Sequence, residues 1–335
     1  MDKIAIVILN WNGQHFLEKF LPSVTTYSQE AIIYVADNGS SDHSISFLQT
    51  NYPAIRIIVL PNNLGFCGGY NIALAQIEAE YYVILNSDIE VTYDWLLSPI
   101  NYLDKNSDVA ACQPKIKSFH DKTLLEHAGA AGGFIDILGF PFCRGRVFLD
   151  IEKDNAKYND TIDVFWATGA ALIIRATTFH ETGGFDPDFF AHMEEIDLCW
   201  RMKNAGYRIV YCGTSEVYHV GGGTLPKSNP RKTFLNFRNG LGLLVKNLPL
   251  RLLFPILISR MLLDAVAAFQ FFLVGYPKDA FAVFRAHMSF YAHFFRWFGR
   301  RKNIPTKLPS GILRKSIVWE HFIMKKTNYQ QIRNK

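Results

Sequence analysis

Short apolar runs alternate with amphipathic segments over the first 90 residues of the chain. The runs are rich in β-branched residues and predict strands, and the segments between them have the apolar spacing of helices. The strand runs occupy residues 3–10, 31–37, 55–60 and 81–91, and the helix segments occupy 16–24, 44–52 and 67–80. Strands that alternate with helices are typical of a mainly parallel sheet with helices on both faces. The sequence therefore predicts an α/β fold.

Polar residues follow each of the four predicted strands. In sheets of this kind, ligands bind beyond the carboxyl ends of the strands. A single polar residue at a strand end is commonly a turn residue or a helix cap. Four consecutive strands that all end this way predict a binding site along one edge of the sheet. The residues are Asn10 and Asn12, Asp37 and Asn38, Asn62 and Asn63, and Asp88 and Glu90.

The last of these strand ends has the composition of a metal site. Asp88 and Glu90 stand two residues apart, so in an extended segment both side chains would point the same way. Carboxylate oxygens are the ligands that Mg²⁺ and Mn²⁺ prefer, and substrate phosphates commonly complete the coordination. The pattern indicates a divalent cation at this edge of the sheet.

Three acids crowd the start of "EEIDLCWRMKNAG", which has the pattern of an amphipathic helix closed by Gly206. The helix macrodipole accounts for one or two acids at an N-terminus. Glu194, Glu195 and Asp197 together would raise the pKa of at least one carboxyl, as a general base requires. Further along, His219 precedes three glycines. A histidine there is either structural, a metal ligand or a phosphate contact.

Two later regions have a different character. Residues 126–145 are glycine-rich and predict a loop. Residues 240–300 are apolar over long stretches, and the window Leu252–Val274 is long enough to span a membrane but contains Arg260 and Asp264. These two residues are four apart and could pair on one helix face. We favour helices that lie in the membrane interface; a spanning helix and a soluble hydrophobic subdomain are the alternatives.

Charge divides the chain unevenly. Residues 226–335 hold 20 Lys and Arg against three acids, whereas residues 1–225 hold 15 Lys and Arg against 27 acids. A basic part of this kind suits an anionic surface, and its apolar stretches favour a membrane over nucleic acid. The five cysteines form no CxxC pair, which is typical of reduced thiols in a cytoplasmic protein. The first apolar run is too short for a signal peptide.

The motifs and their order resemble family 2 glycosyltransferases of the GT-A fold, in the branch of bacterial rhamnosyltransferases. The resemblance extends over roughly residues 3–240 and rests on "VILNWNG", "VADNGSSD", "NLGFCGGYN", "ILNSDIEV", "TGAALIIR", "GGFDPDFFAHMEEIDLCWR" and "VYHVGGGT". It implies a Rossmann-like GT-A catalytic domain over residues 1–240, followed by a basic, aromatic-rich helical region over residues 241–335 that associates with a membrane.

The resemblance also implies roles for single residues. Glu195 matches the family's catalytic base, a position that is commonly Asp; Glu194 and Asp197 belong to the same catalytic cluster, with Asp197 bracing its helix. Asp88 matches the last acid of the D-x-D metal motif, whose first Asp is replaced here by Asn86. His219 and Glu90 are the other expected ligands of Mg²⁺ or Mn²⁺. The residues expected to bind the donor are Asn10, Asn12, Asp37, Asn38, Asn63, Gly65, Gly69, Asn71, Ser87, Asp88 and Arg238.

The implied activity is inverting transfer of rhamnose or another hexose from a nucleotide-diphosphate donor to a hydroxyl of a glycan acceptor. The acceptor is expected to be linked to a polyprenyl diphosphate and to belong to cell-surface polysaccharide synthesis. The enzyme is expected to lie in the cytoplasm, peripherally on the inner face of the bacterial cell membrane, with an anionic membrane surface as a partner and without nucleic acid.

Three other functions fit the sequence less well. An NAD-dependent oxidoreductase would share the parallel sheet, but G-x-G-x-x-G does not follow the first strand. A nucleotidyltransferase would place a basic, glycine-rich loop after that strand, where "NWNGQHF" has no Lys or Arg. The third is a catalytically weak scaffold that binds sugar nucleotide within a membrane glycan-assembly complex. The altered D-x-D motif permits this scaffold, whereas Glu195, Asp197 and His219 argue against it.

Overall fold

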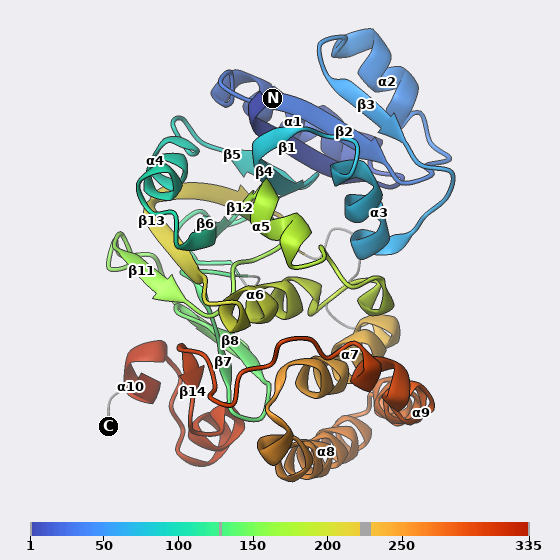
Figure 1. Cartoon of the computed structure of the whole chain (residues 1–335), viewed down its shortest axis with the longest axis vertical. Coiled ribbons are helices and arrows are strands. Elements are labelled where there is room, and N and C mark those ends of the chain that lie inside the picture. Colours follow the sequence, from blue (N-terminus) through green and yellow to red (C-terminus); the bar gives the residue numbers. More distant parts are fainter. Residues whose placement is uncertain (1, 127–128, 222–228, 334–335) are drawn as a thin grey trace.

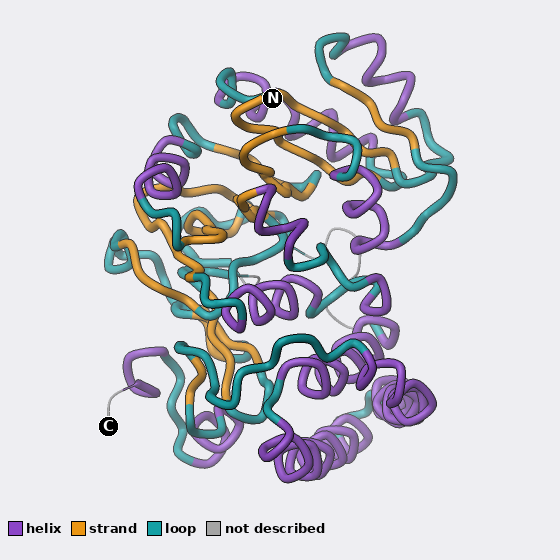
Figure 2. Tube along the Cα trace, viewed as in Figure 1, coloured by secondary structure: helices purple, strands orange, loops and turns teal. Residues whose placement is uncertain are grey.

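A computed structural model describes residues 2–126, 129–221 and 229–333 of the chain. Figure 1 shows a large sheet with its helices in the upper part of the molecule and long helices beside a smaller sheet in the lower part. Figure 2 shows strands and helices intermixed in the upper part of the molecule and mainly helices beside the smaller sheet in the lower part. The predicted α/β class is confirmed.

The N-terminal part follows the predicted alternation of strands and helices. Its elements are β1 (Asp2–Asn10), α1 (Gln14–Tyr27), β2 (Ile32–Asp37), α2 (Ser44–Asn51), β3 (Arg56–Val59), α3 (Gly65–Leu74) and β4 (Ala79–Asn86). The strands pair in parallel in the order β3–β2–β1–β4. Alternate residues of β1 enter two separate apolar clusters, with Val7 on the side of α3 and Ile6 on the side of α1. Both faces of the sheet are therefore covered, as the continuous apolar runs predict.

The sheet continues beyond β4 with strands of both directions. β12 lies antiparallel between β4 and β6, β13 runs parallel to β6, and β11 and β5 pair antiparallel with β13. The elements of this half are β5 (Ile89–Val91), α4 (Leu97–Lys105), β6 (Val109–Ser118), β11 (Thr161–Val164), β12 (Ala171–Arg175), α5 (Ala176–Glu181), the 3₁₀ turn η1 (Pro187–Phe189), α6 (Glu194–Asn204) and β13 (Arg208–His219). β13 brings His219 beside Ile89, next to the turn that ends β4.

The glycine-rich segment 126–145, predicted as a loop, forms strands instead. Within it β7 and β8 make an antiparallel hairpin, which joins a second, five-stranded sheet. The prediction was wrong because the apolar residues between the glycines, such as Phe134 and Ile135, are buried by elements distant in the sequence. The strands of this sheet are β7 (Gly133–Asp136), β8 (Pro141–Cys143), β9 (Arg146–Val147), β10 (Asp150–Ile151) and β14 (Ile312–Leu313).

Three long helices follow β13 and pack on one another. They are α7 (Pro230–Asn247), α8 (Leu250–Leu273) and α9 (Pro277–Gly299), and the chain continues to the π-helical turn η2 (Trp319–Ile323) and α10 (Tyr329–Arg333). Residue 240, the predicted domain boundary, lies inside α7, and β14 from the C-terminal part completes the second sheet. The division into two domains stays a prediction.

α8 has two contrasting faces. Leu253, Leu257, Arg260 and Asp264 are buried toward the protein, at the spacing of one helix face. Arg260 and Asp264 form the predicted ion pair, with 2.8 Å between Nε and Oδ1, and the imidazole of His287 in α9 lies 3.2 Å from Oδ2. The opposite face is apolar and exposed. By length and composition α8 could cross a membrane, and 28% of its most apolar window is buried against the protein.

Candidate active site

The ends of β1 and β2 bring three predicted donor residues together. Asn10 and Asp37 are opposite each other in the parallel register, and Asn10 Nδ2 donates to Asp37 Oδ2 at 3.1 Å. Asn38 follows Asp37, and all three side chains are buried. Buried polar groups of this kind need partners, yet no described residue donates to Asn10 Oδ1. The strand ends thus hold a buried polar cluster in which one acceptor, Asn10 Oδ1, has no donor among the described residues.

Asn38 holds the glycine-rich turn in place. Its Nδ2 donates to Asn63 Oδ1 and to the carbonyl of Gly65, and its Oδ1 accepts from the amide of Leu64. Gly65 has a φ of +72°, and a Cβ there would lie 2.6 Å from the ring of Phe190. Gly69 in α3 permits a similarly close approach, since its Cβ would lie 2.7 Å from Leu9. Both predicted glycines therefore serve close packing beside the strand ends.

Three further side chains predicted to bind the donor lie at different places: Asn12 after β1, Ser87 after β4 and Asn71 in α3. Asn12, with a φ of 50°, accepts a hydrogen bond from the amide of Ser41 at 2.7 Å. Ser87 lies on the turn after β4. Its Oγ is 3.8 Å from the point that a Cβ atom would occupy if Gly13 carried a side chain. Asn71 exchanges two hydrogen bonds with the backbone of Phe185, at 2.7 and 3.0 Å. Asn71 thus joins α3 to the loop that precedes α6.

Asp88 and His219 meet at the turn after β4, as the predicted metal site requires. His219 Nε2 lies 3.2 Å from Asp88 Oδ1, and Nδ1 lies 3.3 Å from Glu126 Oε2. Burial alone would lower the pKa of His219, but the carboxylates of Asp88 and Glu126 raise this pKa to about 10. Glu126 is a functional candidate that sequence reasoning missed. An acid at the start of an otherwise apolar, glycine-rich segment was the available signal.

Glu90, the third predicted metal ligand, has a different partner. Its carboxylate forms an ion pair with Lys122, whose ammonium also lies 4.1 Å from the centre of the Tyr218 ring. The structure therefore brings Asp88 and His219 together and places Glu90 in a separate, partly exposed ion pair. Residues 222–224 of the predicted glycine-rich loop after His219 lie outside the described residues.

The acids of α6 occupy its first turn. Glu195 is partly exposed, Glu194 is buried, and no described residue donates a hydrogen bond to the Oε2 atom of either. Burial raises the pKa of Glu195 to about 7, and burial together with the charge of Glu195 raises the pKa of Glu194. Phe190, His192 and Met193, just before the helix, all have positive φ angles. Backbone in such sparsely populated conformations persists only where the surrounding structure holds it, and it is common at functional sites.

Asp197 faces the protein interior and is fully paired. It receives hydrogen bonds from Arg201 Nε at 2.8 Å, Lys246 Nζ at 2.7 Å and Asn247 Nδ2 at 2.8 Å. Burial alone would raise the pKa of Asp197, but Lys246 and Arg201 outweigh burial and hold it at about 2. Asp197 therefore braces α6 against α7, whereas Glu194 and Glu195 keep unpaired oxygens.

The loop that leads into α6 is held from the helical region. Lys246 Nζ binds Asp186 Oδ2 at 2.6 Å, and Arg300 forms ion pairs with Asp186 and Asp188. Asn239 Nδ2 donates to the carbonyls of Phe189, Ala191 and His192. The structure places Arg238, a predicted donor ligand, at the same loop, where it donates to the carbonyls of Asp188 and Phe189.

The Asp88 site has the right chemistry to share a divalent cation with a diphosphate. Among the described residues, no group of three or more His, Cys, Asp and Glu side chains is arranged to hold a metal by itself. The chain offers the carboxylate of Asp88 and the ring of His219, whose other nitrogen faces Glu126. Because the pKa of His219 is raised to about 10, a cation held at Nε2 would have to displace a proton from the ring. Mg²⁺ in particular commonly relies on one or two carboxylates plus substrate phosphates. These residues therefore fit a metal whose coordination is completed by the donor.

The sheet order, the polar strand ends and the acidic helix define a glycosyltransferase of the GT-A fold. The solved mannosyltransferase PcManGT from Pyrobaculum calidifontis, in complex with GDP-Man and Mn²⁺, has a similar fold. Its TM-score is 0.53 at 14% identity, over 89% of this chain and 83% of that chain. The family model described as glycosyl transferase family 2 matches residues 5–174, and the chain belongs to this family.

Two curated relatives are rhamnosyltransferases by name. The N-acetylglucosaminyl-diphospho-decaprenol L-rhamnosyltransferase of Mycobacterium tuberculosis (strain H37Rv) is 24% identical over 65% of this chain and 76% of its own length. The rhamnosyltransferase WbbL of Escherichia coli K12 is 27% identical over 64% of this chain and 83% of its own length. The predicted family, its rhamnosyltransferase-like character and the assignment as an enzyme are confirmed.

Proposed function

We propose that this glycosyltransferase moves rhamnose from a nucleoside-diphosphate donor to a hydroxyl group of a glycan carried on a polyprenyl diphosphate. The observation that carries the proposal is that the protein has both a partly exposed carboxyl with a raised pKa, Glu195, and a polar strand-end site whose residues suit a diphosphate and a cation. The names of the two curated relatives support rhamnose and a lipid-linked acceptor.

The proposed reaction is an inverting displacement in which Glu195 is the general base. Glu195 accepts the proton of the acceptor hydroxyl while that oxygen forms a bond to the anomeric carbon of the donor sugar. The bond between the anomeric carbon and the diphosphate breaks, and the nucleoside diphosphate leaves with the electron pair. The proton on Glu195 then passes to solvent.

The surrounding residues would position the donor, the cation and the catalytic helix. Asn10, Asn12, Asp37 and Asn38 would hold the nucleoside, and the turn of Asn63 and Gly65 would lie beside it. Asp88 and His219 would hold a divalent cation, which when bound supplies positive charge to the leaving diphosphate. Asp197, with both oxygens paired, would position α6 so that Glu195 faces the acceptor.

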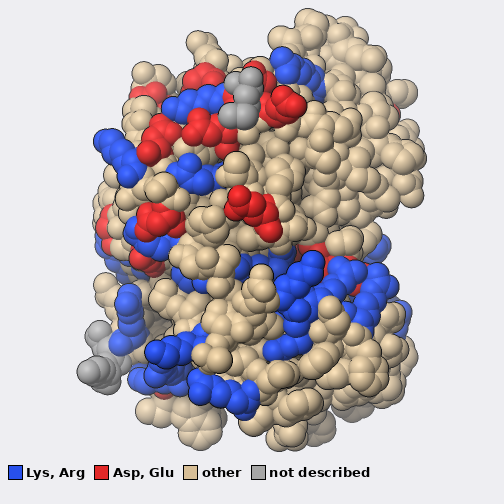
Figure 3. Space-filling view, in the orientation of Figure 1, with Lys and Arg blue, Asp and Glu red and all other residues tan. Residues whose placement is uncertain are grey.

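We further propose that the enzyme lies peripherally on the inner face of the cell membrane. The outward faces of α8 and α9 carry large apolar side chains, including Phe254, Leu262, Phe269 and Phe295, each at least 57% exposed. Figure 3 shows basic side chains gathered over the lower half of the molecule, the half that contains these helices. Apolar faces flanked by Lys and Arg are typical of helices in the interface of an anionic bilayer.

The test is a transfer assay with purified protein, Mn²⁺ or Mg²⁺, and N-acetylglucosaminyl-diphospho-polyprenol as acceptor. We expect dTDP-rhamnose to yield an acceptor heavier by one deoxyhexose in mass spectrometry. Transfer from UDP-glucose or GDP-mannose instead would replace rhamnose as the donor sugar. Nucleotide binding without transfer to any acceptor in a membrane lipid extract would contradict the enzymatic proposal and favour the scaffold.

A further inference from the structure

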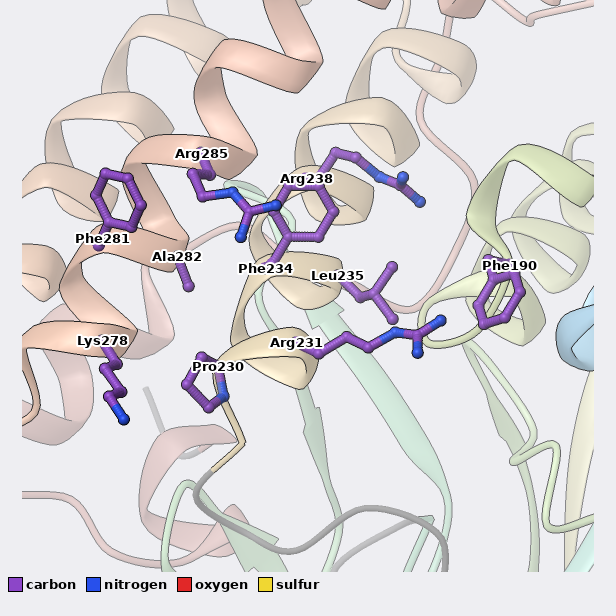
Figure 4. A pocket seen from close by; sticks show the side chains of 10 residues that line it. All are labelled: Phe190, Pro230, Arg231, Phe234, Leu235, Arg238, Lys278, Phe281, Ala282 and Arg285. Atoms are coloured by element: carbon purple, nitrogen blue, oxygen red, sulfur yellow. The ribbon is translucent and has the colours of Figure 1, made fainter. Parts of the chain in front are cut away.

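A pocket of about 480 Å³ opens between the first turns of α7 and α9. Its lining combines four cations, Arg231, Arg238, Lys278 and Arg285, with the rings of Phe190 and Phe234. Figure 4 shows that Phe234 stands between Arg238 and Arg285, while Arg231 extends toward Phe190. None of these cations takes part in the displacement proposed above for Glu195.

Among the described residues the four cations form no ion pair, although the charge of Asp188 acts on Arg238, whereas other basic residues nearby do form ion pairs. Arg296 and Arg300 of α9 bind Asp188, and Lys246 of α7 binds Asp186 and Asp197. The described residues form no ion pair with any of the four pocket cations, and none of the pocket-lining residues is acidic. Like charges gathered around one pocket repel one another, and Asp188 near Arg238 and Asp279 beside Lys278 offset only part of this repulsion. An anion in the pocket would relieve this repulsion.

Aromatic rings hold three of the guanidinium groups in position. Arg231 lies 5.1 Å from the centre of the Phe190 ring, and Arg238 and Arg285 lie 5.4 and 5.6 Å from the centre of the Phe234 ring. A cation held over a ring is favourable and limits the rotamers that the long side chain samples. The guanidinium groups of Arg231 and Arg285 are thus arranged before a ligand arrives, and such groups suit phosphate oxygens. Arg238 contributes mainly its charge, because its Nε and Nη2 already donate to Asn239 and to the carbonyls of Asp188 and Phe189.

Both helices begin at the pocket. Pro230 and Arg231 form the start of α7, and Lys278 belongs to the first turn of α9. The hydroxyl of Thr233 in α7 donates to Asp279 Oδ1 in α9, so the two starts are linked. Helix N-termini carry partial positive charge and favour anions. The partial charge at the start of α7 therefore adds to the side-chain charges, whereas Asp279 offsets the partial charge at the start of α9.

The pocket lies between the acidic helix and the apolar surface. On one side Phe190 belongs to the strained loop before Glu195, and its carbonyl accepts from the amide of Phe66 at 2.8 Å. On the other side Phe281, which also lines the pocket, is 60% exposed and continues into the apolar face of α9 with Phe284. A ligand with an anionic group in the pocket could therefore extend an apolar chain in one direction and a sugar toward Glu195 in the other.

We propose that this pocket binds the diphosphate group of the lipid-linked acceptor, an isoprenoid diphosphate ester. The inference rests on the proposed function for the identity of the lipid, and assigns the acceptor a subsite separate from the strand-end donor site. A diphosphate ester suits the site because it presents several phosphate oxygens to several cations and carries an apolar chain.

Binding of farnesyl diphosphate, measured by titration calorimetry, tests the proposal without requiring turnover. The double variant R231Q/R285Q removes two exposed cations, and R314Q/K315Q, which removes two exposed cations elsewhere in the basic C-terminal part, is the matched control. We expect R231Q/R285Q to weaken the binding of farnesyl diphosphate at least about 10-fold, since the variant loses charge-assisted hydrogen bonds from two guanidinium groups to phosphate oxygens. The control variant should bind as the unaltered protein does, and inorganic pyrophosphate should bind more weakly because it lacks the apolar chain.

Two further measurements on the same variants separate the sources of phosphate. If R231Q/R285Q loses thermal stabilisation by dTDP with Mn²⁺, the pocket belongs to the donor and the proposal is overturned. If only flotation with phosphatidylglycerol vesicles is lost, the pocket binds a lipid headgroup, which also overturns it. Failure of the unaltered protein to bind farnesyl diphosphate would do the same. Binding at the pocket without sugar transfer would instead refute the proposed function and leave the pocket intact.

Discussion

Glu195 is the side chain on which the proposed chemistry depends. Its Oε2 atom has no donor among the described residues, and the variant E195Q keeps its size while removing its ability to accept a proton. We expect sugar transfer by E195Q to fall about 10²–10⁴-fold, the usual cost of losing a general base. The measurement is the rate of product formation at saturating donor and acceptor.

The matched control for this variant is E181Q. Glu181 is exposed at the end of α5, and its replacement should leave both transfer and thermal stability unchanged. E195Q should melt no lower than the unaltered protein, because the replacement removes a charge that is costly to bury. Transfer by E195Q within about threefold of the unaltered rate would exclude Glu195 as the base.

The raised pKa of Glu195 predicts the pH dependence of the reaction. Only the deprotonated carboxylate can accept a proton, so the rate should rise with pH through an apparent pKa near 7. An apparent pKa near 4.5, the ordinary value for Glu, would mean that burial does not raise the pKa of Glu195. The profile of turnover between pH 5 and 9, at a fixed metal concentration, checks this prediction.

Stability should depend on pH in the opposite sense. Between about 4.5 and 7 the folded protein retains a proton on Glu195 that the unfolded chain has lost. The contribution of this group to stability is therefore present at low pH and declines as pH rises through this window. E195Q should remove that decline in a series of urea unfolding curves, while E181Q should retain it.

Single residues of the site were predictable where the sequence pattern is local. Asn10, Asp37 and Asp88 follow apolar runs, so their place at the sheet edge could be read from the order of strands. Glu126 and Lys246 were not predictable, because their partners His219 and Asp197 lie far along the chain. Lys246 interrupts an apolar run, which indicates burial with a partner but not which partner.

Among the elements, α6 depends most on a contact with another part of the chain. Lys246 Nζ lies 2.6 Å from Asp186 and 2.7 Å from Asp197, and all three side chains are buried. The variant K246M would leave two buried carboxylates without their shared cation. We expect the free energy of unfolding to fall by about 3–5 kcal/mol in urea unfolding, as for other broken buried pairs.

K302M is the control for that prediction. Lys302 is exposed after α9, and its replacement should change the free energy of unfolding by less than about 0.5 kcal/mol. If K246M is as stable as K302M, the link between α6 and α7 does not hold the acidic helix in place.

The elements themselves were predictable to different degrees. β1 to β4 and the helices between them follow from apolar periodicity, since β1 and β4 are largely buried on both faces and even the partly exposed strand β3 is a run of apolar residues after Arg56. The hairpin of β7 and β8 was missed, because its pairing with β14 joins Ile135 to Ile312, and no local pattern reports such a contact. The pairing of Arg260 with Asp264 was predictable because one turn of helix separates them.

At the scale of the whole molecule, the apolar face of α8 and α9 predicts attachment to a bilayer. A variant with L262S, F269S and F295S changes side chains that are 65, 63 and 85% exposed, so the fold should be kept. Each apolar side chain is worth about 1.5–3 kcal/mol when fully buried, so the combined loss of bilayer affinity should exceed about 100-fold. Flotation with vesicles that contain phosphatidylglycerol measures it.

A second triple variant tests whether the effect depends on the location of the apolar side chains on α8 and α9. V59S, Y93S and L149S change side chains that are 60, 75 and 85% exposed on other parts of the surface. This triple variant should float with vesicles as the unaltered protein does. Equal flotation of all three proteins would show that α8 and α9 do not contact the bilayer.

The central claim is that the strand-end edge binds a nucleoside diphosphate through a metal at Asp88. The most direct measurement is the melting temperature of the protein with UDP, dTDP or GDP, each in the presence of Mn²⁺, Mg²⁺ or EDTA. We predict that one nucleotide, expected to be dTDP, raises the melting temperature only with metal. The rise should be lost in D88N and kept in D94N, a change at an exposed acid a few residues away. A folded protein that none of the nucleotides stabilises, or a D88N variant that keeps the full rise, would contradict the claim.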